Sequence, residues 1–326
     1  MPQSYAAGLP PDRFCCLLDE LPLHLIAQHA RNSLRLKDKE QGPLLLNPDC
    51  MVCPAEQLPD EIAKRADLVC GFALQGTVAW VRDPATRNLL PFWLGPELEA
   101  AVRNLQHDAQ PDPLRGGIRE VLLGAGILVP AGYEATRLRN WNEATKRSSV
   151  GFCRDGYAAV ADLIHPYHIA ALRRYYRYLI RNGVIHLGDG QSPRRYIAYN
   201  EPVARFFHHQ IAATLSAVAG EPLKPSYVYL ASYLSGAELK KHTDRKQCEF
   251  SVTLCLDFSP EPAFETPWPI RLDAASGSVA IHQALGDGLA YRGTQLPHHR
   301  NVLGEGCSST SIFFHYVAEG FAGSLD

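Results

Sequence analysis

The pattern of residue types after position 225 restricts the possible folds more than any other part of the sequence. Short runs rich in β-branched and aromatic residues follow one another there, separated by turn-forming sequences such as SPEP, ASG, GDG and GEG. These runs are SYVYLASYL (226–234), FSVTLCLDF (250–258), WPIRL (268–272), SVAIHQ (278–283), GLAYRG (288–293) and STSIFFHYV (309–317). A parallel sheet would need crossover helices, and the connections are too short to hold them. We therefore predict an antiparallel β-sandwich or jelly roll.

Two helical patterns precede these strands. The first begins at Pro166, a residue that suits the first turn of a helix, runs through HIAALRRYYRYLIRN and ends at Gly183. The second, EPVARFFHHQIAATLSAVAG, covers 201–220 and also ends at a glycine. Just before the first helix, DGYAAVADLI (155–164) predicts a strand. The β-rich part is therefore expected to be braced by helices.

The N-terminal part of the chain mixes strand-like and helical patterns. These are LVCGFALQGTVAWV (68–81), GPELEAAVRNL (95–105) and RGGIREVLLGAGILV (115–129). The segment 126–152 then changes from apolar to polar and charged, as a connection between domains does. We predict an α+β fold with two domains, a small mixed α/β domain over 1–148 and the β-rich domain over 149–326.

The charge balance and the hydropathy of the chain argue against some classes of binding partner. The 32 Lys and Arg residues nearly balance the 34 Asp and Glu residues, which gives no electrostatic footprint for nucleic acid or an anionic membrane. The start of the chain has no basic segment followed by an apolar run, and no stretch approaches the length of a spanning helix. We expect a cytoplasmic protein that has neither a nucleic-acid nor a membrane partner.

The cysteines favour reduced thiols. There are nine, an odd number, scattered along the chain. Cys50 and Cys53 form one CxxC, but no second pair follows to complete a tetrahedral zinc site. A structural zinc is therefore not expected.

The segment KKHTDRKQCEF contains two candidate metal ligands. His242 and Asp244 are two residues apart at a strand-like position, so both side chains point to one face. The sequence PHHRN, much further along, offers a third ligand, either His298 or His299. Two histidines and one carboxylate on one face leave open coordination positions, which is the arrangement of non-haem Fe(II) oxygenases. His315 in the last predicted strand could also face the metal, and Glu249 could orient a metal-bound histidine.

These residues resemble a known family. YLASYLSGAELKKHTD is similar to the Y-x(2)-G-x(2)-L-x(2)-H-x-D stretch of prolyl-4-hydroxylase-like Fe(II)/2-oxoglutarate oxygenases. The matching residues are Tyr233, Gly236, Leu239, His242 and Asp244. SVTLCLDF resembles the strand after the HxD motif, and HHRNVLGEG resembles the tract at the family's distal histidine. The resemblance covers approximately residues 152 to 320 and says nothing about the N-terminal part.

The resemblance implies a double-stranded β-helix, or jelly roll, with Fe(II) held by His242, Asp244 and His298. It also implies 2-oxoglutarate and O2 as co-substrates, and hydroxylation of an unactivated C–H bond with succinate and CO2 as co-products. The family's halogenases replace the carboxylate with a small residue, so an intact Asp244 favours hydroxylation, desaturation or cyclisation. Of the adjacent histidines, His298 is preferred because Arg300 shares its face.

One departure from the family concerns the distal carboxylate of 2-oxoglutarate. The family carries Arg or Lys about ten residues after the distal histidine, where this chain has Ser308 and Ser309. No basic residue lies between Asn301 and Asp326. The cation must therefore come from elsewhere. The candidates are Arg300 first, Arg292 and Arg271 in reserve, Ser309 or Ser311 as hydroxyl donors, and Tyr229 or Tyr233 as phenolic donors.

The substrate is expected to be an amino-acid-like small molecule or a residue in a peptide, with the small molecule favoured. The N-terminal domain could hold a peptide or form a homodimer interface. Two other functions are also compatible with the sequence. A cupin-like sensor or regulator would bind metal without oxygenase turnover, and a regulator with an N-terminal winged helix would bind DNA in a salt-dependent way.

Overall fold

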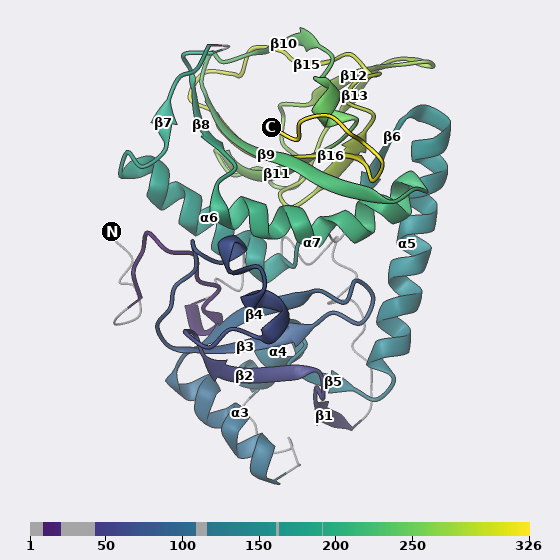
Figure 1. The fold of residues 1–326 in the computed structure, drawn as a ribbon. Helices are drawn as coiled ribbons and strands as arrows, with labels where there is room; N and C mark the ends of the chain where they lie inside the picture. The colour runs from purple at the N-terminus through teal and green to yellow at the C-terminus, as the bar shows by residue number, and fades with distance from the viewer. Residues whose placement is uncertain (1–8, 21–42, 109–115, 161–162, 191) are drawn as a thin grey trace. The chain divides into compact units, whose positions relative to one another are not determined.

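The structure is a computed structural model, and it describes residues 9–20, 43–108, 116–160, 163–190 and 192–326 (Figure 1). The chain has a mixed α+β fold that divides into two compact units. Unit 1 comprises Met1–Trp141 and His165–Tyr178, and unit 2 comprises Asn142–Ile164 and Leu179–Asp326. The predicted domain boundary at residue 148 falls inside helix α5 (Tyr133–Asp155) and stays a prediction.

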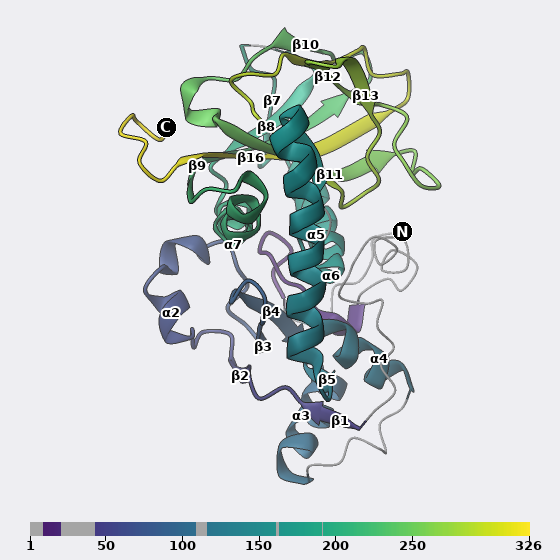
Figure 2. The same cartoon turned by 90° about the vertical axis from the view of Figure 1, so that its right-hand side faces the viewer.

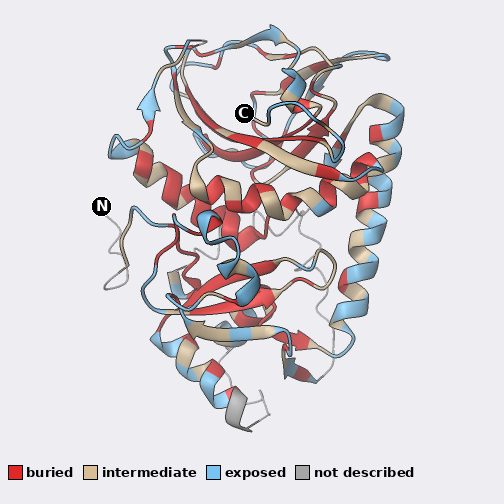
Figure 3. Cartoon of the chain, viewed as in Figure 1, coloured by how far each residue is buried: buried red, intermediate tan, exposed pale blue. Residues whose placement is uncertain are grey.

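Unit 1 is built on a three-stranded antiparallel sheet of order β2-β3-β4. Its strands are β1 (Leu44–Leu46), β2 (Cys50–Pro54), β3 (Thr77–Arg82), β4 (Leu89–Leu94) and β5 (Leu128–Pro130), with β1 paired to β5. Its helical segments are η1 (Leu18–Glu20), α2 (Asp60–Ala63), η2 (Ala66–Leu68), α3 (Pro96–Asp108), α4 (Gly116–Ala125) and most of α6 (Pro166–Arg181). Every residue of β4 is buried, so this strand lies at the centre of the unit's core (Figure 3).

Unit 2 contains two antiparallel sheets (Figures 1 and 2). The larger has the order β6-β14-β11-β16-β9-β8-β7 and the smaller β10-β15-β12-β13. The larger sheet comprises β6 (Tyr157–Val160), β7 (His186–Leu187), β8 (Arg195–Tyr199), β9 (Leu223–Leu234), β11 (Phe250–Ser259), β14 (Gly288–Tyr291) and β16 (Ser308–Ala318). The smaller comprises β10 (Leu239–His242), β12 (Ile270–Ala274), β13 (Gly277–Ile281) and β15 (His298–Arg300); the turn η3 (Lys246–Cys248) precedes β11. The predicted change to β-rich texture after residue 225 is confirmed.

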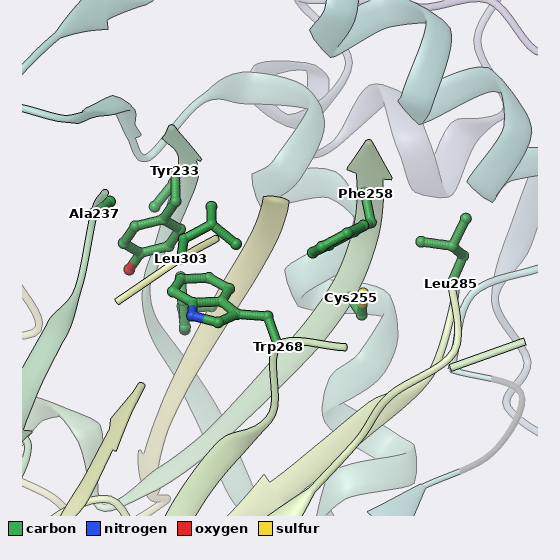
Figure 4. Packing of buried hydrophobic residues seen from close by; sticks show 9 residues of the cluster. Tyr233, Ala237, Cys255, Phe258, Trp268, Leu285 and Leu303 are labelled. Carbon is green, nitrogen blue, oxygen red and sulfur yellow. The ribbon is translucent and has the colours of Figure 1, made fainter. Parts of the chain in front are cut away.

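The two sheets of unit 2 share a core. One hydrophobic cluster joins Ile270 and Leu272 of β12 to Leu289 and Tyr291 of β14. A second cluster packs side chains of β9 and β11 against residues from the loops around the smaller sheet (Figure 4). Its buried members are Ala231, Tyr233, Ala237, Cys255, Phe258, Trp268, Leu285, Leu303 and Phe313. Burial of apolar side chains on both inner faces holds the sheets against each other.

Helix α7 (Pro202–Ala219) covers the larger sheet, as its sequence pattern predicts (Figure 1). The Glu201 carboxylate accepts a hydrogen bond from the Ala204 amide at the N-cap, and Pro202 occupies the first turn. Gly220 ends the helix in the left-handed conformation, with a φ of 78°. No helix within the described ranges is both long and apolar enough to cross a membrane.

The imidazole of His208 in α7 generates a pH dependence of stability. It is buried, its Nε2 lies 2.7 Å from the His315 carbonyl oxygen, and burial lowers its pKa well below the usual 6.5. As the pH falls below about 6.5, the unfolded chain binds a proton that folded His208 does not, so stability falls by up to about 1.4 kcal/mol per pH unit. We expect this loss in urea unfolding followed by circular dichroism, with a smaller slope in His208→Gln. Equal slopes in the two proteins would contradict it.

Candidate metal centre and its cavity

The pairing of β10 with β15 brings His242 and His298 directly opposite each other. Their ring centroids are 4.4 Å apart. Asp244 follows in the loop after β10, and its Oδ1 lies 3.6 Å from Nε2 of His242 and 3.5 Å from Nε2 of His298. One ligand atom from each of the three residues lies within 4.8 Å of the others. The structure therefore brings together two imidazole nitrogens and a carboxylate oxygen that could hold one metal ion.

Backbone carbonyl groups orient both imidazoles. Nδ1 of His242 lies 2.7 Å from the Lys240 oxygen, and Nδ1 of His298 lies 3.0 Å from the Leu296 oxygen. A carbonyl oxygen can only accept, so each Nδ1 carries the proton and donates it. Each Nε2 then presents a lone pair toward the other members of the triad, as a metal-binding histidine does.

A short chain of hydrogen bonds fixes the Asp244 carboxylate. Ser251 Oγ donates to Asp244 Oδ2 at 2.8 Å and accepts from Nδ1 of buried His315 at 2.9 Å. This arrangement leaves Oδ1 for the two histidines. Burial alone would raise the pKa of Asp244, but the nearby imidazoles of His298 and His315 and the hydrogen bond from Ser251 hold it below its usual value. Asp244 is therefore ionised and available as a ligand at neutral pH.

A second group of potential ligands, Asp244, Cys248 and His315, lies beside the first. Only a thiolate binds metal, and burial raises the pKa of the Cys248 thiol to about 12. Its sulfur lies 3.0 Å from the Tyr227 hydroxyl oxygen. His315, which the sequence left as a residue that could face the metal, lines the same cavity and is linked to Asp244 through Ser251. Cys50 and Cys53 belong to neither group of potential ligands found among the described residues.

Two residues close to the triad in sequence, His299 and Glu249, make other contacts. His299 is paired with Arg271 of β12 and points to the face opposite His298. Glu249, considered as a support for a metal-bound histidine, instead accepts a hydrogen bond from the Ala318 amide at 2.9 Å. The backbone carbonyls of Lys240 and Leu296 orient the two histidines, which is the role considered for Glu249.

The triad opens onto a cavity of about 990 Å³. Tyr229 and Tyr233, both expected at a co-substrate site, line it together with His242, Asp244 and His298. The remaining lining side chains are mostly polar or aromatic. They include Asp189, Arg194, Arg195, Tyr199, Tyr227, Glu238, Lys240, Arg245, Tyr291, Phe313 and His315.

Arg300 and Arg292 do not line this cavity. Arg300 is buried, donates to the Trp268 carbonyl at 2.6 Å and to Gln283 Oε1 at 3.3 Å, and lies 4.9 Å from the Trp268 ring centroid. Arg292 lies over the rings of Phe152 and Phe250. The structure thus places both predicted arginines against aromatic rings of the core.

Ser309, Ser311 and Arg271 also lie outside the cavity wall. Ser309 and Ser311 are buried on β16, opposite Tyr233 and Ala231 of β9. Arg271 lies on β12 and is paired with His299 of β15. None of the three is placed beside the triad in this structure, and their proposed contacts with 2-oxoglutarate stay predictions.

Arg195 is a cavity residue that the sequence analysis missed. It begins β8, directly opposite Tyr233 of β9, and Tyr233 is in turn opposite Ser309 of β16. Residues in one such row share a face of the sheet. Arg195 therefore lies on the same face of the larger sheet as Ser309. The only sequence signal was the alternation of Arg195, Ile197 and Tyr199 in a short run.

No protein-family model and no curated protein matches the chain. Its structural neighbours are Fe(II)/2-oxoglutarate-dependent oxygenases, including a prolyl-4-hydroxylase, at low identity over about half the chain. The non-haem α-ketoglutarate-dependent epimerase SnoN from nogalamycin biosynthesis is 16% identical, with a TM-score of 0.45 over 54% of this chain and 83% of that one. A second SnoN structure contains Fe3+, α-ketoglutarate and nogalamycin RO.

Two further neighbours have similar statistics. A Pseudomonas putida prolyl-4-hydroxylase is 16% identical, with a TM-score of 0.44 over 53% of this chain and 99% of that one. EctD from S. alaskensis, with 2-oxoglutarate and 5-hydroxyectoine, is 16% identical, with a TM-score of 0.43 over 53% and 75% of the two chains.

Gly293 leaves room for the Asp244 carboxylate. Its carbonyl accepts from the Asp244 amide at 2.8 Å, and a Cβ at this position would overlap Asp244 Oδ2, the Cys248 carbonyl oxygen and Ser251 Oγ. We expect Gly293→Ala to displace Asp244 and to weaken Co(II) binding, followed by absorbance, about tenfold or more. Gly304→Ala is the matched control, because its Cβ would meet only the Cys307 sulfur, at 3.8 Å. Unchanged Co(II) affinity in folded Gly293→Ala would contradict this role.

Proposed function

We propose that the chain is a non-haem Fe(II)/2-oxoglutarate-dependent dioxygenase that hydroxylates an unactivated C–H bond. The observation that carries the proposal is the convergence of His242 Nε2, His298 Nε2 and Asp244 Oδ1 beside a cavity. Two imidazoles and one carboxylate on one side of an ion leave its other side open to co-substrates. Within this proposal, the two facing sheets of unit 2 form a double-stranded β-helix, or jelly roll, braced by helices.

The donor set fits Fe(II). Neutral imidazole nitrogens and an ionised carboxylate are suitable ligands for this ion, and the backbone carbonyls already select the tautomer that binds. Bound Fe(II) would supply the activation of O2, with 2-oxoglutarate oxidised to succinate and CO2. In this role His242, Asp244 and His298 hold the ion, while Ser251 and His315 keep the carboxylate in place.

The cavity supports a small-molecule substrate over a peptide. Its volume of about 990 Å³ lies within the usual range for small-molecule sites. Polar, charged and aromatic side chains line it, which suits a substrate of amino-acid character. Hydroxylation is preferred over halogenation because Asp244 is present and oriented toward both histidines. A homodimer through the N-terminal part stays a prediction.

Loss of a triad residue should abolish turnover. With Fe(II) reconstituted anaerobically and O2 then admitted, we expect the native chain to form succinate from 2-oxoglutarate with candidate amino acids and peptides. His242→Ala and Asp244→Ala should reduce the rate on the order of 100-fold or more, because each removes a metal ligand. His186→Ala, at an exposed position on β7, is the matched control and should keep the native rate.

The same experiment separates the proposal from a metal-binding sensor. Anaerobic addition of 2-oxoglutarate to the Fe(II)-loaded chain should produce a charge-transfer absorption band that Asp244→Ala lacks. Fe(II) binding without this band, and equally negligible succinate formation in all variants, would favour the cupin-like sensor and exclude the dioxygenase.

A further inference from the structure

The cavity wall contains an arginine that is almost completely buried. The Arg195 side chain is only 4% exposed, yet it lines the same cavity as the metal triad. Its guanidinium lies 5.5 Å from the ring centroid of Tyr229 and 5.8 Å from that of Tyr233. A buried guanidinium is stable only when an anion or several acceptors satisfy it.

The chain supplies that anion itself. Arg195 Nε donates to Asp189 Oδ2 at 3.0 Å, and a second guanidinium nitrogen contacts the same oxygen. The Tyr229 hydroxyl donates to Asp189 Oδ2 at 2.8 Å, and Arg195 also lies 3.4 Å from the Tyr233 hydroxyl. The Ser192 amide holds the other oxygen, Oδ1, at 2.8 Å. A carboxylate therefore already lies at a site built of an arginine and two phenols.

This site and the triad occupy the same cavity. A dicarboxylate bound to the metal by one end could reach Arg195 with the other end, without leaving the cavity. Arg300 has no comparable access, because two of its nitrogens bond the Trp268 carbonyl and Gln283, and its guanidinium lies against the Trp268 ring outside the cavity wall. Arg195 shares one face of the larger sheet with Tyr233, which also lines the cavity.

We propose that Arg195 binds the distal carboxylate of 2-oxoglutarate, and that Asp189 is the internal carboxylate which the co-substrate displaces from it. The inference rests on the proposed function and adds a determinant of co-substrate affinity. Asp189 Oδ2 and a distal carboxylate need the same donors, namely the guanidinium of Arg195 and the hydroxyl of Tyr229. Asp189 thus acts as a competitor, and co-substrate binds only as far as it outcompetes this residue.

The test is calorimetric titration of the Fe(II)-loaded full chain under anaerobic conditions with 2-oxoglutarate and with pyruvate. Pyruvate has the same keto-acid end but no distal carboxylate. Asp189→Asn should bind 2-oxoglutarate about fivefold or more tightly than the native chain, because a neutral amide competes less well for the guanidinium. Glu238→Gln, which removes a charge from the cavity wall at an exposed position, is the matched control and should show a smaller change.

Arginine variants complete the test. Arg195→Met should weaken 2-oxoglutarate binding about tenfold or more and leave pyruvate binding within about twofold, because only the distal carboxylate loses its partner. Arg300→Met should leave the ratio of the two affinities near the native value. The measured ratio distinguishes loss of the distal contact from general damage to the fold, which would weaken both ligands.

Specific outcomes would overturn the inference. Unchanged or weaker 2-oxoglutarate binding by folded Asp189→Asn would show that Asp189 does not compete. Selective loss of 2-oxoglutarate binding in Arg300→Met, but not in Arg195→Met, would assign the distal carboxylate to Arg300. Failure of the native Fe(II)-loaded chain to bind either keto acid would instead overturn the proposed function itself.

Discussion

The antiparallel pairing of β10 with β15 is the interaction on which the site depends. It sets His242 opposite His298, two residues that are far apart in sequence, and it also positions the start of the loop that carries Asp244. Both strands are short, so contacts with neighbouring strands are needed to stabilise their pairing. β15 is also paired with β12, and the apolar side chains of β12 pack against β14 in the larger sheet. Closure of the two sheets thus fixes the distance between the two imidazoles, and side-chain hydrogen bonds only adjust their orientation.

Around this pairing, buried polar groups form a connected set. His315 on β16, Ser251 on β11 and the Asp244 carboxylate are linked in one chain of hydrogen bonds, which ties the loop after β10 to the two central strands of the larger sheet. A buried polar group without a partner costs about 1–3 kcal/mol, so each member of such a chain depends on the next. Gly293 completes the arrangement, because any side chain there would occupy the space of the carboxylate.

The sequence predicted local geometry better than contacts made through the fold. The two-residue spacing of His242 and Asp244 predicted that they lie together, although β10 ends at His242 and Asp244 lies in the loop after it; the alternation of β15 separated His298 from His299. Arg300 shows the limit of such reasoning. It follows the same alternation, but the position of Trp268 in the core closes it off from the cavity. Arg195 was missed because its relation to Tyr233 and Ser309 exists only through the register of three strands, which no local pattern encodes.

The Arg195–Asp189 ion pair illustrates a constraint on buried sites that bind anions. A guanidinium placed in a cavity wall to bind a carboxylate must also be tolerated before that carboxylate arrives. Leaving a buried charge without its partner costs about 3–5 kcal/mol, a large part of the stability of a typical domain. An internal carboxylate such as Asp189 removes this penalty in the ligand-free protein. The same contact then subtracts from the binding free energy of the ligand, because the ion pair must be broken first. Stability of the free protein and affinity for the anion are therefore coupled through one side chain.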